Sequence, residues 1–569
     1  MLRIPALLLL SLACKCNDDT GGDDSPADTA PAGFRPDVVC PGDDACPTAT
    51  GALQAGAAME PITPTCYETW EDLDGNGEYS STSESYYDCG CDHLCEGDDG
   101  YPGPDEGEGD GEFQAVWMAG FQNGRPANSV HDDLWARAVV LRQGETSIAL
   151  VSVDVVGYFN DEVDLVREEA AAAGVGVDHI VVTATHVHEG PDTMGMWGKA
   201  VFQSGVDEDY MTYVRAQIVA AVAAAEDNLT DATLRVGVGD SNTTSDTKGS
   251  RNTIRDSRDP VIIDQDVNVA WLRDPSGGTI ATLVNWGNHP EVLSDENTAL
   301  TSDFVHYVRE SMEDGIDYTS YDVAGKGGVC VYLQGTVGGL MTPLGIEVTD
   351  GDGNNYSESN WDKAQALGRV VAEVALDALD NGQDVTDPDL AVRMVRFYMP
   401  VDNYGFQAMS LGGVFDRETY NWDDTKDISD TNVPELRTEM DLIDVGPIRM
   451  MTVPGELFPE IAVGGYDQSR VGTTADEFIA SDNPNPPDIS AAPAGPYLKE
   501  RMGAEYNWVL GLGNDELGYI VPAYDFKVDE NSPYLAEPEG DHYEETNSTG
   551  PNAAPLVDEH ADLLLTWTP

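Results

Sequence analysis

Apolar runs of strand length alternate with helical patterns along most of the chain. Residues 134–143 and 147–157 are two such runs, separated by a short polar turn. Residues 160–174 have apolar positions at helical spacing, and residues 179–185 are again an apolar run. Two strands with a helix between them predict a β-α-β unit with parallel strands.

The same alternation continues toward the C-terminus. Two further segments, 207–229 and 360–381, have helical spacing. Strand-like runs occupy 267–274, 278–288, 328–335, 390–400 and 448–456. This order predicts an α/β fold in which helices flank a mixed β-sheet. Apart from two acidic turns, the sequence shows no internal repeat.

The first 14 residues have the features of an export signal. Arg3 precedes a short apolar run that ends at Cys14. Cys14 follows Ser-Leu-Ala, which resembles a lipoprotein cleavage site and predicts lipid attachment; a cleaved secretory signal is the alternative. The run is too short to span a bilayer, and we expect no transmembrane helix elsewhere. We therefore expect an exported protein, either secreted or a cell-surface or outer-membrane lipoprotein, that contacts a membrane only through its N-terminal lipid.

Two segments separate this signal from the main domain, 113–569. Residues 15–60 are rich in Asp, Gly, Pro, Thr and Ala, which predicts a disordered acidic tether. Residues 61–112 form an acidic, cysteine-containing segment. Six cysteines precede the main domain: Cys40, Cys46, Cys66, Cys89, Cys91 and Cys95. In an exported protein an even number of cysteines favours disulfides, although three thiolates with His93 could instead bind zinc. Cys330, in an apolar run, is expected to be a buried thiol.

An acidic loop within 61–112 has the alternation of a calcium-binding loop. Asp72, Asp74, Asn76 and Glu78 alternate around two glycines, as oxygen ligands of Ca²⁺ do. Ser83 occupies the position where an EF-hand has its bidentate glutamate, so the match is incomplete. An acidic, solvated turn is the alternative interpretation.

The charge of the chain limits its partners. It has 103 acidic and 29 basic residues among 569, for a formal net charge of -74. Binding to a phosphate backbone requires a basic surface, so a nucleic-acid partner is disfavoured and none is expected. The acidity is spread along the chain and does not identify a substrate.

Three strand-like runs end in residues that can bind a metal. His186 and His188 follow the run 179–185, and alternate residues of a strand point to the same face, so both rings are expected at one site. His289 follows a second run, and Glu456 a third, after Gly455. Two histidines and a carboxylate are a common ligand set for zinc, which lowers the pKa of bound water to about 7. Hydrogen-bonding loop histidines and a helix-terminal glutamate are the alternatives.

Several segments together resemble the neutral/alkaline ceramidases. These are "TATHVHEGP", "NWGNHPE", "VPGELFPEIAVGG" and "GLGNDELGYIV", in the order and approximate spacing of that family. The similarity covers roughly residues 113–569. Members of the family are zinc amidohydrolases that cleave the N-acyl bond of ceramide.

The resemblance implies a role for particular residues. The family's zinc ligands match His186, His289, Glu456 and Tyr519. His188 matches the histidine that contacts the substrate amide. A family arginine corresponds best to Arg251, with Arg255 and Arg258 as alternatives. Zinc-bound water would then attack the amide carbonyl, with His188 and Arg251 stabilising the oxyanion.

The sequence departs from the family in three places. The family's Gly-Asp-Val-Ser-Pro loop corresponds to "LQGTVGGLMTP", with Thr336 for the acid and Gly338 for the serine. The family's C-terminal immunoglobulin-like domain is expected to be absent, and the acidic segment before residue 113 is an addition. The loop at Gly338 puts ceramide specificity in doubt. A zinc esterase or amidase with a non-lipid substrate, or a non-catalytic calcium-dependent surface protein, are therefore alternatives.

Overall fold

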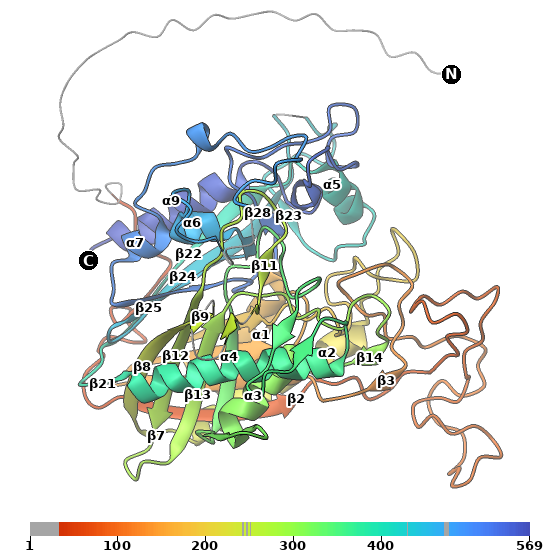
Figure 1. The fold of residues 1–569 in the computed structure, drawn as a ribbon, viewed down its shortest axis with the longest axis horizontal. Coiled ribbons are helices and arrows are strands. Elements are labelled where there is room, and N and C mark those ends of the chain that lie inside the picture. Colours follow the sequence, from red (N-terminus) through yellow and green to blue (C-terminus); the bar gives the residue numbers. More distant parts are fainter. Residues whose placement is uncertain (1–32, 242–243, 246–248, 251, 430, 472–476) are drawn as a thin grey trace, which may run out of the picture.

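A computed structural model describes residues 33–569, apart from 242–243, 246–248, 251, 430 and 472–476. The predicted export signal 1–14 with Cys14, and Arg251, lie outside the described residues. Three large β-sheets with helices against them make up most of the described chain, so the predicted mixed α/β fold is confirmed (Figure 1).

The first sheet contains the predicted β-α-β unit. Its strands, in spatial order, are β6 (His179–Ala184), β5 (Thr146–Val153), β4 (Trp135–Gln143), β2 (Gln54–Pro61) and β7 (Thr230–Asp231). Only β5 and β6 are parallel. Helix α1 (Asn160–Ala173) connects these two strands, and α2 (Glu208–Asp227) follows and packs on β2 and β4.

The second sheet has the same topology. Its strands, in spatial order, are β17 (Val329–Gln334), β13 (Thr279–Trp286), β12 (Asp266–Arg273), β8 (Thr233–Asp240) and β21 (Gln383–Val385). Only β13 and β17 are parallel. Helix α3 (Phe304–Asp314) connects them, and α4 (Trp361–Asn381) packs on β8 and β12.

The third sheet repeats this arrangement once more. Its strands, in spatial order, are β27 (Tyr506–Leu510), β25 (Ile448–Thr452), β24 (Glu435–Val445), β22 (Leu390–Pro400) and β1 (Val38–Cys40), with β23 (Thr419–Tyr420) beside β24. Only β25 and β27 are parallel. Short helices α6 (Pro459–Val463) and α7 (Leu498–Met502) lie between them in sequence, and α9 (Ala553–Thr566) packs on β22 and β24.

The three large sheets and their helices are therefore three copies of one structural unit, whereas the expectation of no internal repeat concerned the sequence. Each unit has three antiparallel strands, a crossover to a fourth strand parallel to the third, and a helix on the first two strands. The edge strands β7 and β21 lead directly into the next unit, and β1 closes the third sheet from the N-terminal side. The copies share a pattern of pairing and burial rather than residue identities, so the sequence alone did not reveal them.

Corresponding glycines let a helix approach the first strand of two units. A Cβ on Gly56 in β2 would lie 2.1 Å from the Ala225 carbonyl oxygen of α2. A Cβ on Gly237 in β8 would lie 2.2 Å from the Ala378 carbonyl oxygen of α4. Only glycine permits this separation between helix and sheet backbones.

The three sheets face one another across a shared core. Apolar side chains from all three contribute to one buried cluster, for example Leu150, Leu283 and Met450. The helices cover the opposite faces, where each sheet has a separate apolar cluster with its own helices. The buried faces explain why strands such as β5 are apolar without alternation.

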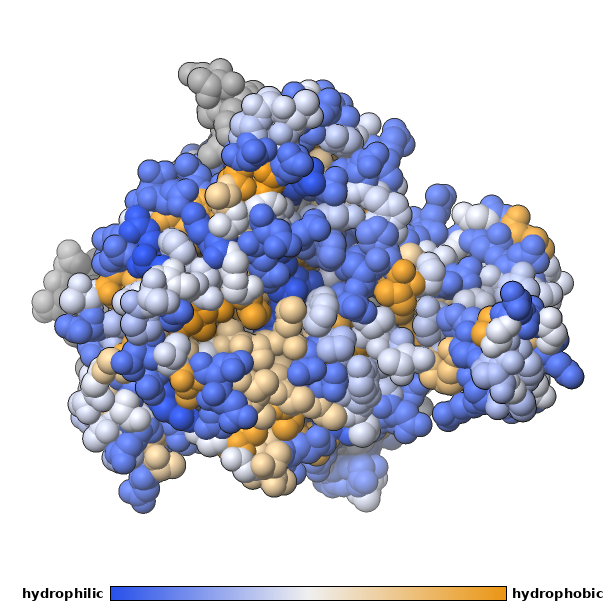
Figure 2. Space-filling model, turned by 90° about the horizontal axis from the view of Figure 1, so that it is seen from below, coloured by the Kyte–Doolittle hydropathy of each residue, from blue (hydrophilic) through white to orange (hydrophobic). Residues whose placement is uncertain are grey.

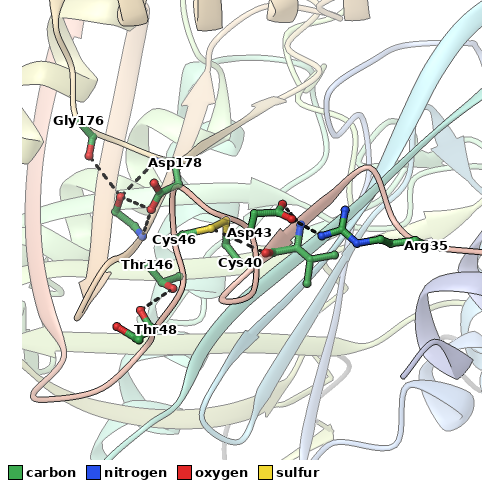
Figure 3. The surroundings of a disulfide bond; sticks show 10 residues. Arg35, Cys40, Asp43, Cys46, Thr48, Thr146, Gly176 and Asp178 are labelled. Atoms are coloured by element: carbon green, nitrogen blue, oxygen red, sulfur yellow. Dashed lines mark hydrogen bonds and ion pairs between the residues drawn. A yellow bond between two sulfur atoms is a disulfide. The ribbon is translucent and has the colours of Figure 1, made fainter. Parts of the chain in front are cut away.

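The prediction of a disordered tether is wrong for residues 38–60, whereas its residues 15–32 lie outside the described part of the chain. Residues 38–61 contain β1 and β2, which belong to two of the large sheets. Cys40 and Cys46 form a disulfide within the shared core, and Asp43 accepts a hydrogen bond from the Val39 amide and pairs with Arg35 (Figure 3). Composition suggested disorder, but short apolar stretches suffice when long partner strands lie beside them.

Disulfides also bind the acidic segment together. The pairs are Cys66–Cys91 and Cys89–Cys95, which excludes zinc binding by these thiols. The His93 ring nitrogen Nε2 lies 2.7 Å from the Tyr67 carbonyl oxygen, its hydrogen-bond acceptor. Cys330 is a buried free thiol, as expected, and burial raises its pKa to about 12.

Short elements complete the described chain. They are β3 (Ser129–Val130), β9 (Thr244–Ser245), β10 (Gly249–Ser250), β11 (Arg255–Asp256), β14 (Ala299–Leu300), β15 (Gly315–Asp317), β16 (Asp322–Ala324), β18 (Met341–Thr342), β19 (Val348–Thr349), β20 (Asn355–Tyr356), β26 (Glu456–Leu457), β28 (Tyr519–Ile520), α5 (Tyr404–Leu411) and α8 (Tyr543–Thr546). Hydrophilic residues cover most of the face in Figure 2, around a central apolar area. In the described part of the chain, no helix combines the length and apolar character needed to cross a membrane.

Candidate metal centre

Loops that follow the third or fourth strand of the three units meet at one point. His186 and His188 follow β6, the fourth strand of the first unit. His289 follows β13 and Glu456 follows β25, the third strands of the second and third units. Third and fourth strands are parallel in each unit, so their carboxyl ends lie at the same edge, where ligands of α/β proteins commonly bind.

His186 and His188 face one site, but not because a strand continues through them. Strand β6 ends at Ala184, and His186 has a φ of 65°, in the left-handed region that non-glycine residues rarely occupy. The centroids of the two rings are nevertheless 5.0 Å apart. Their convergence is therefore confirmed, whereas the expected extended conformation is wrong. Unusual backbone geometry of this kind is concentrated at functional sites.

Backbone carbonyls determine which nitrogen of two rings faces the centre. The Nδ1 of His186 lies 2.6 Å from the Val156 carbonyl oxygen, and the Nδ1 of His289 lies 2.7 Å from that of Met341. A carbonyl can only accept, so each Nδ1 carries hydrogen and donates. Each Nε2 is thereby directed to the centre, as in metal-binding histidines whose other nitrogen is hydrogen-bonded.

Glu456 completes a group of atoms with the spacing of metal ligands. Its Oε2 lies 3.1 Å from the His289 Nε2 and 3.4 Å from the His186 Nε2. Tetrahedral ligands of zinc, at about 2.0–2.1 Å from the ion, are about 3.3–3.4 Å from one another. The lone pairs of the His186 and His289 Nε2 atoms converge with the Glu456 Oε2, so protons or a metal ion must lie between these three atoms. The donor set fits zinc.

The electrostatics of the centre keep Glu456 ionised. Burial alone would raise its pKa, but His186 and His289 outweigh burial and lower the pKa to about 2. Burial would also lower the pKa of His289, yet Glu456 raises it above its usual value. An ionised carboxylate beside two imidazoles is the form in which these groups bind a cation.

Gly455 allows the chain to pass close to a neighbouring strand just before Glu456, and Tyr519 lies opposite Glu456. A Cβ on Gly455 would lie 2.5 Å from the Gly518 carbonyl oxygen, so only glycine allows the chain to pass there. Glu456 in β26 is directly opposite Tyr519 in the parallel strand β28. Opposite residues leave a sheet on the same face, which brings the Tyr519 side chain to the Glu456 side. Tyr519 is buried, and burial and Glu456 raise its pKa.

His188 has a carboxylate partner that the sequence reasoning missed. The Glu291 Oε2 lies 3.4 Å from the His188 Nδ1, and Thr342 donates a hydrogen bond to the other oxygen of Glu291. Burial lowers the pKa of His188 to about 4, although Glu291 opposes this shift. His188 is therefore neutral near pH 7. Glu291 lies two residues after His289, and this repeated two-residue spacing was the available signal.

A glycine and a buried ion pair position the His188 segment. A Cβ on Gly120 would lie 2.3 Å from the His188 ring, so the ring packs directly on this backbone. Arg125 donates a hydrogen bond to the His188 carbonyl oxygen and pairs with Glu189 at 3.1 Å. These contacts fix the position of the His188 ring and backbone.

The predicted arginine is not placed among these groups. Arg251 lies outside the described residues, and Arg255 is exposed. Arg258 is buried and forms ion pairs with Asp525, Glu544 and Glu545 at 2.7–3.0 Å. Arg258 therefore has a structural partner set, which leaves the assignment of Arg251 a prediction.

A mainly apolar pocket opens onto the centre. Its wall includes His186, His188, Glu456 and Tyr519. The apolar part of the wall comprises Val156, Phe159, Met194, Met196, Trp197, Phe406, Phe415, Leu436 and Leu517. A concave apolar site with a few convergent polar groups is typical of small-molecule binding.

Besides Arg417, Asn547 and Thr549, two polar residues of the pocket wall were not predicted, Tyr543 and Glu516. Tyr543 in α8 lies beside Tyr519, with ring centroids 6.1 Å apart. Glu516 is buried, and its Oε2 has no hydrogen-bond partner. Burial and the nearby Glu456 raise the pKa of the Glu516 carboxyl well above its usual value. Neither residue belongs to a periodic pattern that the sequence could reveal.

Comparison with known proteins identifies the fold. The chain matches the crystal structure of neutral ceramidase from Pseudomonas aeruginosa with a TM-score of 0.58 at 15% identity, over 90% of this chain and 74% of that one. It matches a ceramidase complexed with C2 with a TM-score of 0.57 at 13% identity, over 90% and 75%. The chain has the neutral-ceramidase fold. No family model and no curated protein sequence matches.

The loop at Gly338 packs against the strand β26, which carries Glu456. The Gly338 amide donates to the Leu457 carbonyl oxygen at 3.0 Å. A Cβ there would lie 2.6 Å from the Glu456 carbonyl oxygen and 2.5 Å from the Phe458 ring. A serine at this position would displace the strand that carries Glu456. Glycine therefore follows from close packing against β26.

The acidic loop brings together a different set from the predicted one. Asp72 and Asp74 lie with Glu84, their carboxylate oxygens within 4.8 Å of one another. Asn76 instead accepts a hydrogen bond from the Glu78 amide at 2.7 Å. Glu84 is one residue beyond the expected ligand position. Calcium binding by this loop stays a prediction.

Proposed function

We propose that this protein is a zinc-dependent hydrolase that cleaves an N-acyl amide, ceramide or a related lipid amide. The observation that carries the proposal is the approach of two carbonyl-anchored histidines, His186 and His289, to the Glu456 carboxylate, where His186 and Glu456 line an apolar pocket. Similarity to ceramidase structures, which concerns the fold, supports the same class of reaction.

The residues of this chain divide into two roles in the proposed reaction. His186, His289, Glu456 and Tyr519 would hold the metal. When bound, zinc would activate a water molecule and polarise the acyl carbonyl. His188, neutral and next to Glu291, would accept a proton and deliver it to the leaving amine. The apolar wall would hold the acyl chain and exclude bulk water.

Zinc content and hydrolysis of an N-acyl amide, measured together, test this proposal. We expect purified wild-type protein to contain one zinc and to release the fatty acid. His289→Ala is expected to lose both, whereas His306→Ala, which changes a half-exposed histidine paired with Asp132 outside the pocket, keeps both. Wild-type protein that hydrolyses the amide without zinc would refute the proposal.

A second candidate is a zinc amidase or esterase with a more polar substrate. Glu516 favours it, because a buried carboxyl with a free oxygen in an apolar wall suits a substrate hydroxyl or amine. A panel of ceramide, N-acyl amino acids and simple esters separates the two candidates. A non-catalytic calcium-dependent surface protein is disfavoured because all four ligand-type residues are retained.

We also propose that the protein is exported and attached to a membrane by lipid on Cys14. Three disulfides support export, because such bonds form and persist in oxidising compartments. Metabolic labelling with palmitate tests the lipid. Labelling that is equal in wild type and Cys14→Ser would contradict attachment at Cys14.

A further inference from the structure

Most of the highly exposed apolar side chains lie on segments that line the pocket or that contact such a segment. Among the described residues, five large apolar side chains have exposures of 61–69%. Val201, Phe202 and Leu411 lie on segments that supply pocket residues, and Leu535 lies against α5, one of these segments. The fifth, Leu73, belongs to the acidic loop. Contiguous exposed apolar residues commonly mark a binding surface.

Each of these segments also contributes to the pocket or packs against a segment that does. The loop with Val201 and Phe202 supplies Trp197 to the pocket wall. Helix α5 supplies Phe406 on its inner side and exposes Leu411 on its outer side. The apolar wall therefore continues outward onto the surface.

Direct contacts hold these segments side by side. A Cβ on Gly195 would lie 2.0 Å from the Val414 carbonyl oxygen, so the first loop abuts the end of α5. A Cβ on Gly405 in α5 would lie 3.8 Å from the Leu535 side chain. Val201, Phe202, Leu411 and Leu535 thus form one rim.

Two of the three segments of the rim lack negative charge, whereas the third, residues 529–541 around Leu535, contains Asp529, Glu530, Glu537, Glu539 and Asp541. Residues 193–206 and 403–415 contain no Asp or Glu, although the chain has 103 acidic residues in 569. Lys199 is the single charged residue in these two segments. A surface that must approach lipid loses its hydration, which is costly for carboxylates and favourable for apolar side chains.

We propose that this rim docks the protein on an electrically neutral lipid surface, so that substrate passes from the lipid directly into the apolar pocket. The inference rests on the proposed function for its substrate and adds the partner. A net charge of -74 disfavours anionic lipid by repulsion, which acts within about 10 Å at 0.1 M salt. The rim therefore suits phosphatidylcholine better than phosphatidylglycerol.

Vesicle flotation tests docking separately from the lipid anchor. All proteins are full-length and carry Cys14→Ser, so that no acyl chain is attached. The rim variant is Phe202→Ser/Leu411→Ser/Leu535→Ser, three residues outside the pocket wall. The matched control, Leu73→Ser/Leu165→Ser/Val238→Ser, changes three exposed apolar residues away from the mouth.

We expect the parent to bind phosphatidylcholine vesicles and the rim variant to bind at least about tenfold more weakly, because interfacial binding scales with buried apolar area. The control should bind like the parent. Equal binding by rim variant and control would overturn the proposal. A second result would also overturn it: the parent does not bind vesicles but forms a dimer without lipid, and the rim variant is a monomer. A second copy of the chain would then be the partner that covers the rim.

A soluble short-chain N-acyl amide separates failure of docking from failure of the proposed function. The rim variant should hydrolyse this amide like the parent and lose at least about tenfold on vesicle-bound substrate. Hydrolysis without vesicle binding would overturn the docking proposal alone. Vesicle binding without hydrolysis of any amide would overturn the proposed function and leave the docking surface.

Discussion

The candidate metal centre and the acidic segment 61–112 are held in place by different interactions. His186, His289 and Glu456 are at most 5% exposed and lie at strand ends of three sheets. Segment 61–112 has isolated bridges but no strand beyond Pro61, and two disulfides and carboxylate-capped turns hold it. The comparison teaches that precise ligand placement here depends on sheets, whereas the added segment is held by local restraints and by contacts with the main domain, such as the hydrogen bond from the Trp70 indole to the Pro126 carbonyl oxygen.

Removal of the metal is the sharpest way to separate the two regions. A chelator should reduce amide hydrolysis by about a thousandfold, the equivalent of several kcal/mol of transition-state stabilisation, and added zinc should restore it. The proteolysis pattern of segment 61–112 should not change. Full activity after chelation would show that hydrolysis does not depend on a metal at this site.

Breaking the ion pair behind the centre should destabilise the sheets. Arg309 binds Asp154 with both guanidinium nitrogens, at 2.8 and 2.9 Å, and both residues are buried. Arg309→Met leaves the carboxylate unpaired, which should lower the free energy of unfolding by about 3–5 kcal/mol. Denaturant titration measures this.

The double variant Arg309→Met/Asp154→Leu is the control for this effect. It removes both charges, so much of the lost stability should return. A double variant that is no more stable than Arg309→Met would mean that packing, rather than the unpaired charge, causes the loss.

Removing a disulfide should affect segment 61–112 and leave the centre intact. Cys66→Ser/Cys91→Ser opens a loop with a sequence separation of 25, which should destabilise the segment by about 3 kcal/mol. Limited proteolysis should then cut within 61–112, while zinc content and hydrolysis stay within about twofold of wild type. Loss of zinc in this variant would show that the two regions depend on each other.

Glu291→Gln should distinguish positioning of His188 from metal binding. Loss of the carboxylate should reduce hydrolysis by about 10–100-fold, as for other partners of active-site histidines. Zinc content should stay at one per chain, because His186 and His289 keep their carbonyl partners. A variant that loses zinc in proportion to activity would instead make Glu291 part of the metal site.

The smallest expected effect concerns the thiol of Cys330. Burial raises its pKa to about 12, so native protein at pH 8 should react with a thiol reagent only when it unfolds. Because the folded pKa lies above the unfolded value of about 8.5, the contribution to stability is lost as pH rises above 8.5. Rapid labelling of native protein at pH 8 would contradict this burial.

The outcome for individual elements shows what local patterns can predict. The apolar runs at β4, β5 and β6 and the helical spacing at α1 were predicted close to their observed bounds. Strand β2 was missed because its alanines and glycine have no strong strand pattern, and its pairing with β4 and the contact of Gly56 with α2 keep it in place. Tertiary contacts override weak local preference at such positions.

The sequence by itself determined where strands end in histidine or Pro-Gly-Glu, and thereby which side chains could bind a metal. Tertiary structure alone decided that three units, each with the same topology, bring these ends to one edge and add Glu291, Glu516 and Tyr543 beside them. The physical reason is the distance along the chain over which each interaction acts. Periodicity reports the environment of neighbouring residues, whereas the centre depends on strand pairings and carbonyl contacts between residues far apart in the chain.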